Sequence, residues 1–150
     1  MATPATLKMT GEDLRKNILW DGKRPVGRSF FDSSKTPDDD HSHGTHVAGI
    51  IGAVGNHRRG IAGVSWRVSL IPIKAFDKNG FGTAFRMASA ICFAIRNRAD
   101  VILCSWGASA DSACLRRAVK LAGRRGIALV AAAGNAPLDL DSYRRAKARK

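Results

Sequence analysis

The chain has 150 residues, of which 45% are hydrophobic, so it is long enough and apolar enough to fold as one domain around a core rather than remain disordered. Its 25 Lys and Arg against 12 Asp and Glu give a net charge of +13. The longest strictly apolar run, IALVAAA at 127–133, is far shorter than the ~20 residues of a membrane helix, and the N-terminus lacks the apolar core of a secretory signal, so we expect no membrane association.

The composition of the chain changes near residue 44. Residues 1–42 are polar and rich in turn signals, with short extended pieces such as SFF expected between them. The segment GTHVAGIIGAVG, starting at Gly44, consists of small and apolar residues and predicts a closely packed helix. Residues 67–76, RVSLIPIKAF, have the alternation and β-branching of a strand, against which Pro72 counts.

The second half alternates helical and strand patterns. Residues 83–99 place Met87, Ile91 and Ile95 at helical spacing. A buried-type strand at 101–106 follows, then a helix at 109–126 that begins among Ser and Asp caps and ends at a glycine, then a second buried strand at 127–134. This order predicts a parallel sheet with flanking helices.

Two polar residues follow these buried strands. Ser105 comes after VILC and Asn135 comes after VAAAG. Because sites in parallel sheets gather beyond the carboxyl ends of the strands, both residues are candidates for a functional site.

Three histidines, His41, His43 and His46, lie within six residues in HSHGTH. They could ligate a metal together with nearby aspartates, although their spacing matches no established zinc motif. They could equally form a solvated turn. A third interpretation is a general base: a histidine at the start of the predicted helix lies at the positive end of the helix dipole, which favours the neutral imidazole that can accept a proton.

Six segments carry a resemblance to a known family. They are EDLRKNI at 12–18, HGTHVAG at 43–49, GIAGVS at 60–65, GFGTA at 80–84, DVILCSWG at 100–107 and GIALVAAAGN at 126–135. In order and spacing, over roughly residues 10–136, they resemble the subtilisin-like serine proteases. The resemblance implies a three-layer α/β/α fold, incomplete at both ends, and a serine-type endopeptidase acting on peptide or protein substrates.

The resemblance also implies roles for individual residues. His43 would be the catalytic base, Asn135 the donor to the oxyanion, and His46 a packed helix residue with His41 flanking the motif. Ser105, Trp106 and Gly107 would line the pocket for the substrate side chain, and Gly80 and Gly82 would flank the stretch that pairs with the substrate backbone.

Two members of the family's triad have no counterpart. No aspartate and no apolar strand precede Asp13, where the family has its aspartate-bearing strand. No GTSMA-like segment follows Asn135, where the only serine is Ser142 in DSYRR. We therefore expect a partial peptidase domain that is inactive by itself, with two alternatives: a non-catalytic peptide-binding remnant, or binding of a polyanion through the basic tail.

Cofactors are not required by this chemistry. The family often binds calcium, and Asp13 and Asn56 match two ligand positions, but Arg58 and Arg59 in the same loop would repel a cation. The resemblance thus suggests calcium at this loop, and the two arginines count against it.

The positive charges are clustered in the sequence. Five of the charges lie in the last seven residues, RRAKARK, part of a tail at 137–150 that we expect to be disordered, and five more lie at 116–125. Solvated faces explain them, and no nucleic-acid signature is present, so a nucleic-acid partner is not expected.

Cys92 and Cys104 sit in apolar contexts typical of small core residues, and with Cys114 they are too few for a disulfide framework.

Overall fold

The computed structural model describes residues 2–3, 12–32, 36–56, 58, 60–107 and 111–135. The helices are α1 (Glu12–Arg15), α2 (His43–Gly52), α3 (Ala84–Arg96) and α4 (Ala113–Arg124). The strands are β1 (Ala2–Thr3), β2 (Arg28–Ser29), β3 (Ile71–Lys74), β4 (Val101–Cys104) and β5 (Ala128–Ala131).

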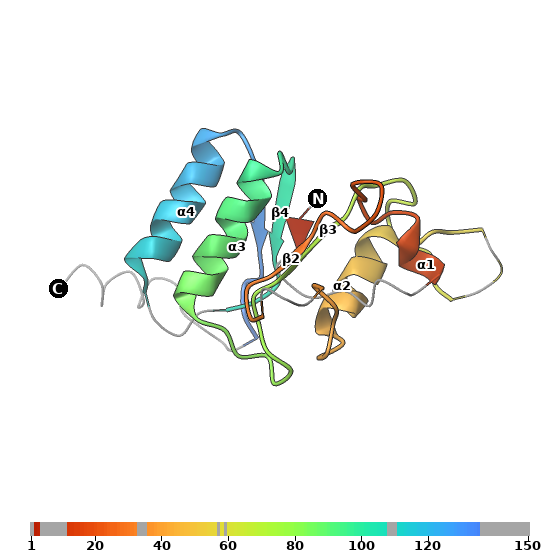
Figure 1. The fold of residues 1–150 in the computed structure, drawn as a ribbon, viewed down its shortest axis with the longest axis horizontal. Helices are drawn as coiled ribbons and strands as arrows, with labels where there is room; N and C mark the ends of the chain where they lie inside the picture. Colours follow the sequence, from red (N-terminus) through yellow and green to blue (C-terminus); the bar gives the residue numbers. More distant parts are fainter. Residues whose placement is uncertain are drawn as a thin grey trace.

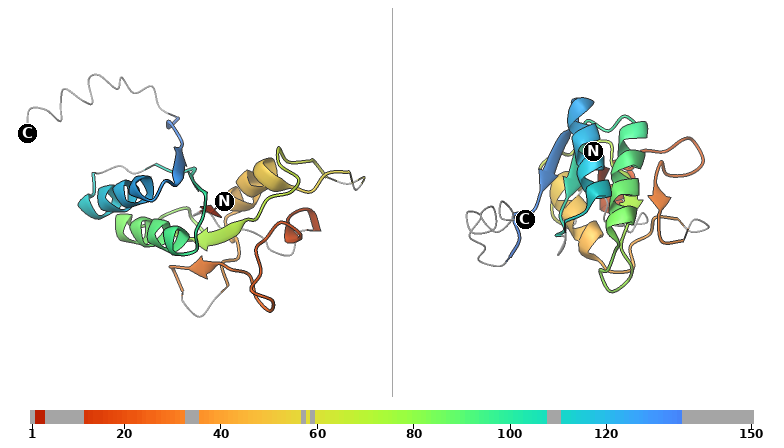
Figure 2. Two further views of the ribbon diagram at one scale, coloured as in Figure 1. Left: turned by 90° about the horizontal axis from the view of Figure 1, so that it is seen from above. Right: turned by 90° about the vertical axis from the view of Figure 1, so that its left-hand side faces the viewer.

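The strands of the described residues form one parallel sheet in the order β2-β3-β1-β4-β5. Figure 1 shows α3 and α4 side by side against one side of this sheet and α2, with α1 at its far end, on the other. The views of Figure 2 show the same division. The parallel α/β architecture expected from the sequence is therefore confirmed.

The larger core lies between the sheet and the helix pair α3–α4. Both helices begin with a side-chain cap: the Thr83 hydroxyl accepts the N–H of Arg86 at 3.3 Å, and the Ser112 hydroxyl accepts the N–H of Leu115 at 3.5 Å. Small side chains let the helices approach the sheet closely. The buried members of this core are Ile71, Ile73, Ala75, Ala88, Ala90, Ile91, Ala94, Ala99, Ile102, Cys104, Ala118 and Ala122.

A smaller core fixes α2 against the opposite side. It contains Leu14, Ile18, Ala48 and Leu70. The buried Asn17 joins its parts, because its side-chain N–H groups donate to the carbonyl of Gly52 at 2.8 Å and to that of Trp66 at 3.0 Å. The C-terminal end of α2 is thereby tied to α1 and to the segment that leads into β3.

Pro72 lies in the middle of β3 and is fully buried, so the strand predicted around it is confirmed. The ladder with β2 pairs only Ile73 and Lys74 of β3, and it therefore starts after the proline. The N–H that Pro72 lacks is therefore not required for a hydrogen bond between β3 and β2.

The sequence did not predict β1. No apolar pattern marks the first residues, yet Ala2 and Thr3 pair with β3, and Ala2 also pairs with β4. The helix and strand ends differ from expectation by a few residues, as in β4, which ends at Cys104 rather than at 106. The basic tail lies outside the described residues, and none of the described helices is long and apolar enough to cross a membrane.

Candidate active site

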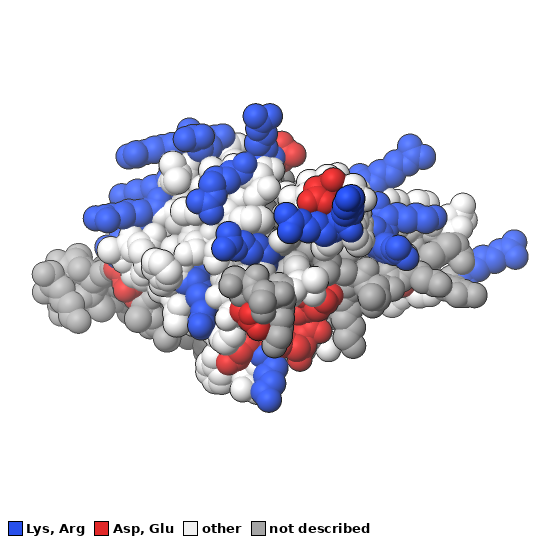
Figure 3. All heavy atoms as spheres, viewed as in Figure 1, with Lys and Arg blue, Asp and Glu red and all other residues white. Residues whose placement is uncertain are grey.

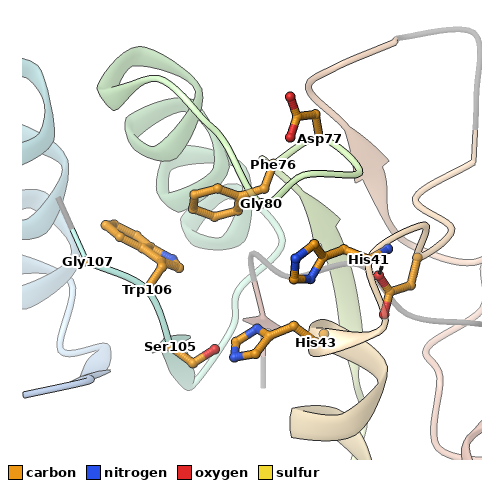
Figure 4. A pocket seen from close by; sticks show the side chains of 10 residues that line it. His41, His43, Phe76, Asp77, Gly80, Ser105, Trp106 and Gly107 are labelled. Carbon is orange, nitrogen blue, oxygen red and sulfur yellow. Dashed lines mark hydrogen bonds between the residues drawn. The ribbon is translucent and has the colours of Figure 1, made fainter. Parts of the chain in front are cut away.

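A pocket of about 260 Å³ opens where the N-terminus of α2 meets the segments that follow β3 and β4. It is lined by Asp39, His41, His43, Gly44, Phe76, Asp77, Gly80, Ser105, Trp106 and Gly107. Figure 4 shows the side chains converging from three segments that are far apart in the sequence. Five of the seven residues expected from the sequence to have catalytic or substrate-binding roles are therefore in one place: His43, Gly80, Ser105, Trp106 and Gly107.

His43 is the first residue of α2, and the geometry of this helix start is set by a residue further upstream. Ser42 occupies the N-cap position with φ +74° but makes no capping hydrogen bond with its side chain. Asp39 takes over this function, since its carboxylate accepts the N–H groups of His41, Ser42 and Thr45 at 2.8–2.9 Å and the Thr45 hydroxyl at 2.6 Å. His43 is thereby held at the mouth of the pocket.

The pKa of the Asp39 carboxyl reflects these bonds. Burial raises its pKa, but the hydrogen bonds from Thr45, His41 and Ser42 outweigh burial and hold the pKa below its ordinary value of 3.8. The carboxylate form, which accepts all four hydrogen bonds, is the form that caps the helix.

The other two histidines have separate positions. The rings of His41 and His43 meet edge to face with their centroids 6.4 Å apart, so His41, expected only to flank the motif, lines the pocket beside His43. His46 is exposed, so the expectation that it packs inside the helix layer was wrong: its position along α2 faces solvent. In the described ranges no three His, Cys, Asp or Glu side chains gather as a metal site, which leaves the metal interpretation of the histidines without support.

The segment after β4 supplies the opposite wall. In Figure 4 the hydroxyl of Ser105 points toward the His43 ring, and the rings of Trp106 and Phe76 lie above them. The two aromatic rings contact each other at a centroid distance of 5.9 Å. The indole N–H of Trp106 is buried and has no hydrogen-bond partner among the described residues, which leave this donor of the wall unsatisfied.

A tight turn at 77–81 forms the rim of the pocket. Asp77 organises it, because its carboxylate accepts the N–H groups of Asn79 and Phe81, both at 2.9 Å. Gly80 adopts φ +79°, and a Cβ there would lie 3.2 Å from the His41 ring. Gly82 is outside the pocket lining, but it packs directly on the Phe76 ring, where a Cβ would come within 2.8 Å of a ring carbon.

Asn135 is exposed and follows β5 at the same edge of the sheet at which Ser105 follows β4, because the two strands are parallel. It is not among the residues that line the pocket. The structure therefore brings Asn135 to the expected edge without bringing it into contact with His43.

The calcium candidates Asp13 and Asn56 both lie at the loop that follows α2. An added Cβ at Gly60 would lie 2.6 Å from the Asp13 carboxylate, so Asp13 sits against the loop that follows α2, and Asn56 is exposed in that loop with φ +61°. No group of three carboxylate, His or Cys side chains among the described residues accompanies them. Calcium thus remains a prediction, and no step of the chemistry is assigned to it.

Comparison with known proteins gives the family. The family model described as "Subtilase family" matches residues 11–148. The chain belongs to the subtilase family. Its 42% identity to the thermophilic serine proteinase of Bacillus sp. (strain AK1) extends over 84% of this chain and 31% of the relative. Its 40% identity to thermitase of Thermoactinomyces vulgaris extends over 81% of this chain and 44% of the relative.

Subtilisin E of Bacillus subtilis (strain 168) is 42% identical over 73% of this chain and 29% of its own length. This subtilase chain thus spans less than half the length of these curated relatives. The relatives include serine proteinases by name, which supports a hydrolase function of protease type for the family to which the chain belongs.

Sequence reasoning missed Asp39, Phe76 and Asp77 as parts of this candidate site. Asp39 stands four residues before His43, inside a run of three aspartates in which no local pattern singles out one member. Asp77 begins the turn DKNG, whose Asx pattern does mark it as a turn former. No sequence pattern marks Phe76 as a site residue, since its position in the pocket depends on how β3 lies beside α2.

The described cations of α4 lie outside the pocket lining. Figure 3 shows Lys and Arg side chains spread over both ends of this face, at α3–α4 and at the opposite end, while a group of carboxylates lies on the lower side. On α4 the charged residues Arg116, Arg117, Lys120 and Arg124 are all exposed, and Arg116 pairs with Asp111. These are the solvated faces expected from the sequence.

Proposed function

We propose that the chain contributes the base, the oxyanion donor and part of the substrate cleft of a serine endopeptidase, and that these 150 residues do not hydrolyse peptides by themselves. The observation that supports this most is the pocket that joins His43, from the start of α2, to Ser105–Gly107, beyond β4, in a subtilase chain. Peptide or protein substrates follow from the protease names of the relatives.

The roles follow from the chemistry of acyl transfer. His43 would accept the proton of a serine hydroxyl as that oxygen attacks the scissile carbonyl, and would return the proton to the leaving amine. Asn135 would donate its side-chain N–H to the oxyanion that forms on the carbonyl oxygen. Its position at the edge that Ser105 shares is compatible with this role.

The nucleophile is the missing part. No segment of residues 1–150 has the Gly-Thr-Ser-Met-Ala pattern that carries the serine in the family, and no aspartate precedes Asp13. An imidazole without a nucleophile forms no acyl-enzyme. Binding of an extended peptide at Gly80–Gly82 and at Ser105–Gly107 does not require the nucleophile, so we expect it to persist.

A fluorophosphonate probe tests the absence of a nucleophile in the full chain. We expect no serine to be labelled, while a complete subtilase in the same assay is labelled stoichiometrically. Labelling of any serine, located by peptide mass spectrometry, would refute the proposal that these residues are inactive by themselves.

A second measurement tests the cleft. A fluorescent extended peptide is titrated against the wild-type chain and against Gly107→Val, which adds bulk at the pocket wall where a Cβ meets nothing within 4 Å. We expect Gly107→Val to lower the affinity at least about tenfold, or 1.4 kcal/mol. Gly123→Val, at an equally open position on α4, is the matched control and should bind as the wild type does. Equal affinities of all three proteins would place peptide binding elsewhere.

A further inference from the structure

Lys74 is a buried cation that the proposed chemistry does not use. It is the last residue of β3 and only 6% exposed. A buried ammonium group is unfavourable unless polar partners replace the water that it has lost. Its partners therefore indicate what it does.

Lys74 makes its ion pair and its hydrogen bond with one loop. Its ammonium group forms an ion pair with the carboxylate of Asp40 and donates a hydrogen bond to the main-chain carbonyl of Asp38 at 3.2 Å. These two residues flank Asp39, the residue that caps α2. Lys74 thus fixes the loop on either side of the cap.

The cap in turn fixes the backbone around the proposed base. Asp39 accepts the N–H groups of His41 and Thr45, two residues on either side of His43. The Asp39 side chain can point toward these N–H groups only while the loop at 38–40 stays in place. Lys74 ties that loop to β3. β3 also leads directly to Phe76 and Asp77, which line the pocket together with His43.

We propose that Lys74 is a positioning residue for His43, acting through the loop at 38–40 and the Asp39 cap. This inference rests on the proposed function only in naming His43 as the base. The competing explanation is that this ion pair only stabilises the fold. Its contribution to stability is small, because the Asp40 side chain is 52% exposed and solvent weakens the attraction of its carboxylate to the ammonium group.

The experiment uses three variants of the full chain, studied at one pH by NMR. Lys74→Met removes the charge at similar length, Lys74→Arg keeps a charged donor, and Ile102→Val is a control that trims a fully buried side chain of β4. Two signals are followed: amide exchange at His41, Ser42 and Thr45, and the imidazole nitrogen signals of His43.

In Lys74→Met we expect exchange at these three amides to accelerate about tenfold or more relative to the β4–β5 amides, because the cap opens locally. We also expect the imidazole signals of His43 to shift. Lys74→Arg should restore both signals toward the wild type. Ile102→Val should accelerate exchange uniformly, with no excess at these three amides, and should leave the imidazole signals of His43 unchanged.

Uniform acceleration at all amides, matching that of Ile102→Val, would overturn the inference and leave Lys74 a stabilising residue only. Unchanged imidazole signals of His43 would overturn it as well. Neither signal requires substrate or turnover. A failure of the peptidase proposal in the probe and peptide assays is therefore a separate result.

Discussion

Asp39 reaches six residues along the chain to Thr45, accepting its main-chain N–H at 2.9 Å and its hydroxyl at 2.6 Å. The residue at the N-cap position, Ser42, adopts a left-handed conformation and leaves this function to the aspartate. The first turn of α2 and the loop before it are therefore one hydrogen-bonded unit, and His43 belongs to it.

Replacing Asp39 with Asn should destabilise the protein. An amide offers only one oxygen to the four donors that the carboxylate satisfies, and we expect a loss of about 1–3 kcal/mol at pH 7. Urea unfolding followed by circular dichroism measures the loss. Asp100→Asn, at an exposed carboxylate beside β4, is the control and should change the free energy of unfolding by no more than about 0.5 kcal/mol.

The effect of Asp39 should depend on pH in one direction. Because hydrogen bonding holds the folded-state pKa below the ordinary 3.8, the unfolded state binds the proton more readily. The stabilisation is therefore fully present above pH 3.8 and is lost as the pH falls through the folded-state pKa. The difference between wild type and Asp39→Asn should stay constant from pH 7 to pH 5 and decrease below 3.8. A difference that grows at low pH would contradict this.

Trp106→Phe should cost little stability, although it trims a half-buried side chain. The indole N–H is buried and finds no partner in the part of the chain that the structure describes, and removing such a donor recovers part of the free energy lost with the ring volume. We expect a change within about 1 kcal/mol, whereas Trp106→Ala should cost about 3–5 kcal/mol. Thermal and urea unfolding give both values. A loss above 2 kcal/mol in Trp106→Phe would mean that the N–H has a partner in solution.

Two glycines near α2 should respond oppositely to alanine. A Cβ at Gly63 would lie 2.4 Å from the main-chain nitrogen of Ala53 and 2.7 Å from the carbonyl oxygen of Gly49. These are main-chain atoms that cannot rotate away, so Gly63→Ala should cost about 1–3 kcal/mol or more. At Gly49, inside α2, a Cβ meets nothing within 4 Å, so Gly49→Ala should stabilise by about 0.5–1 kcal/mol. Urea denaturation tests the pair, and equal effects at both positions would contradict the close packing at Gly63.

The features that sequence predicted are those with local causes. The helices at 84–96 and 113–124 follow from apolar spacing and from caps such as Ser112, and the strands β4 and β5 follow from continuous apolar runs. The strand β1 has no such pattern, because its two residues are ordered by the neighbours β3 and β4. The contact of Lys74 with the loop at 38–40 likewise spans more than thirty residues, so no local signal announces it.

The same difference between local and long-range causes applies to the candidate site. The motif around His43 marked the proposed base, and the segment after VILC marked the opposite wall, since both depend on contiguous residues. The cap at Asp39 and the aromatic contact between Phe76 and Trp106 depend on how separate segments lie together. Exposure of His46 likewise depends on which side of α2 the rest of the chain covers.

Retention on heparin should follow the net charge of the protein and not the location of the charges, because the cations on α4 form a solvated face. The double variant Lys120→Glu, Arg124→Glu should elute at lower salt than the wild type. Lys78→Glu, Arg67→Glu removes as much charge at exposed positions outside α4 and should lower the elution salt equally. If the α4 variant loses much more retention, or if its binding to duplex DNA drops less steeply with salt than that of the control variant, the helix carries a polyanion site and the solvated-face interpretation is wrong.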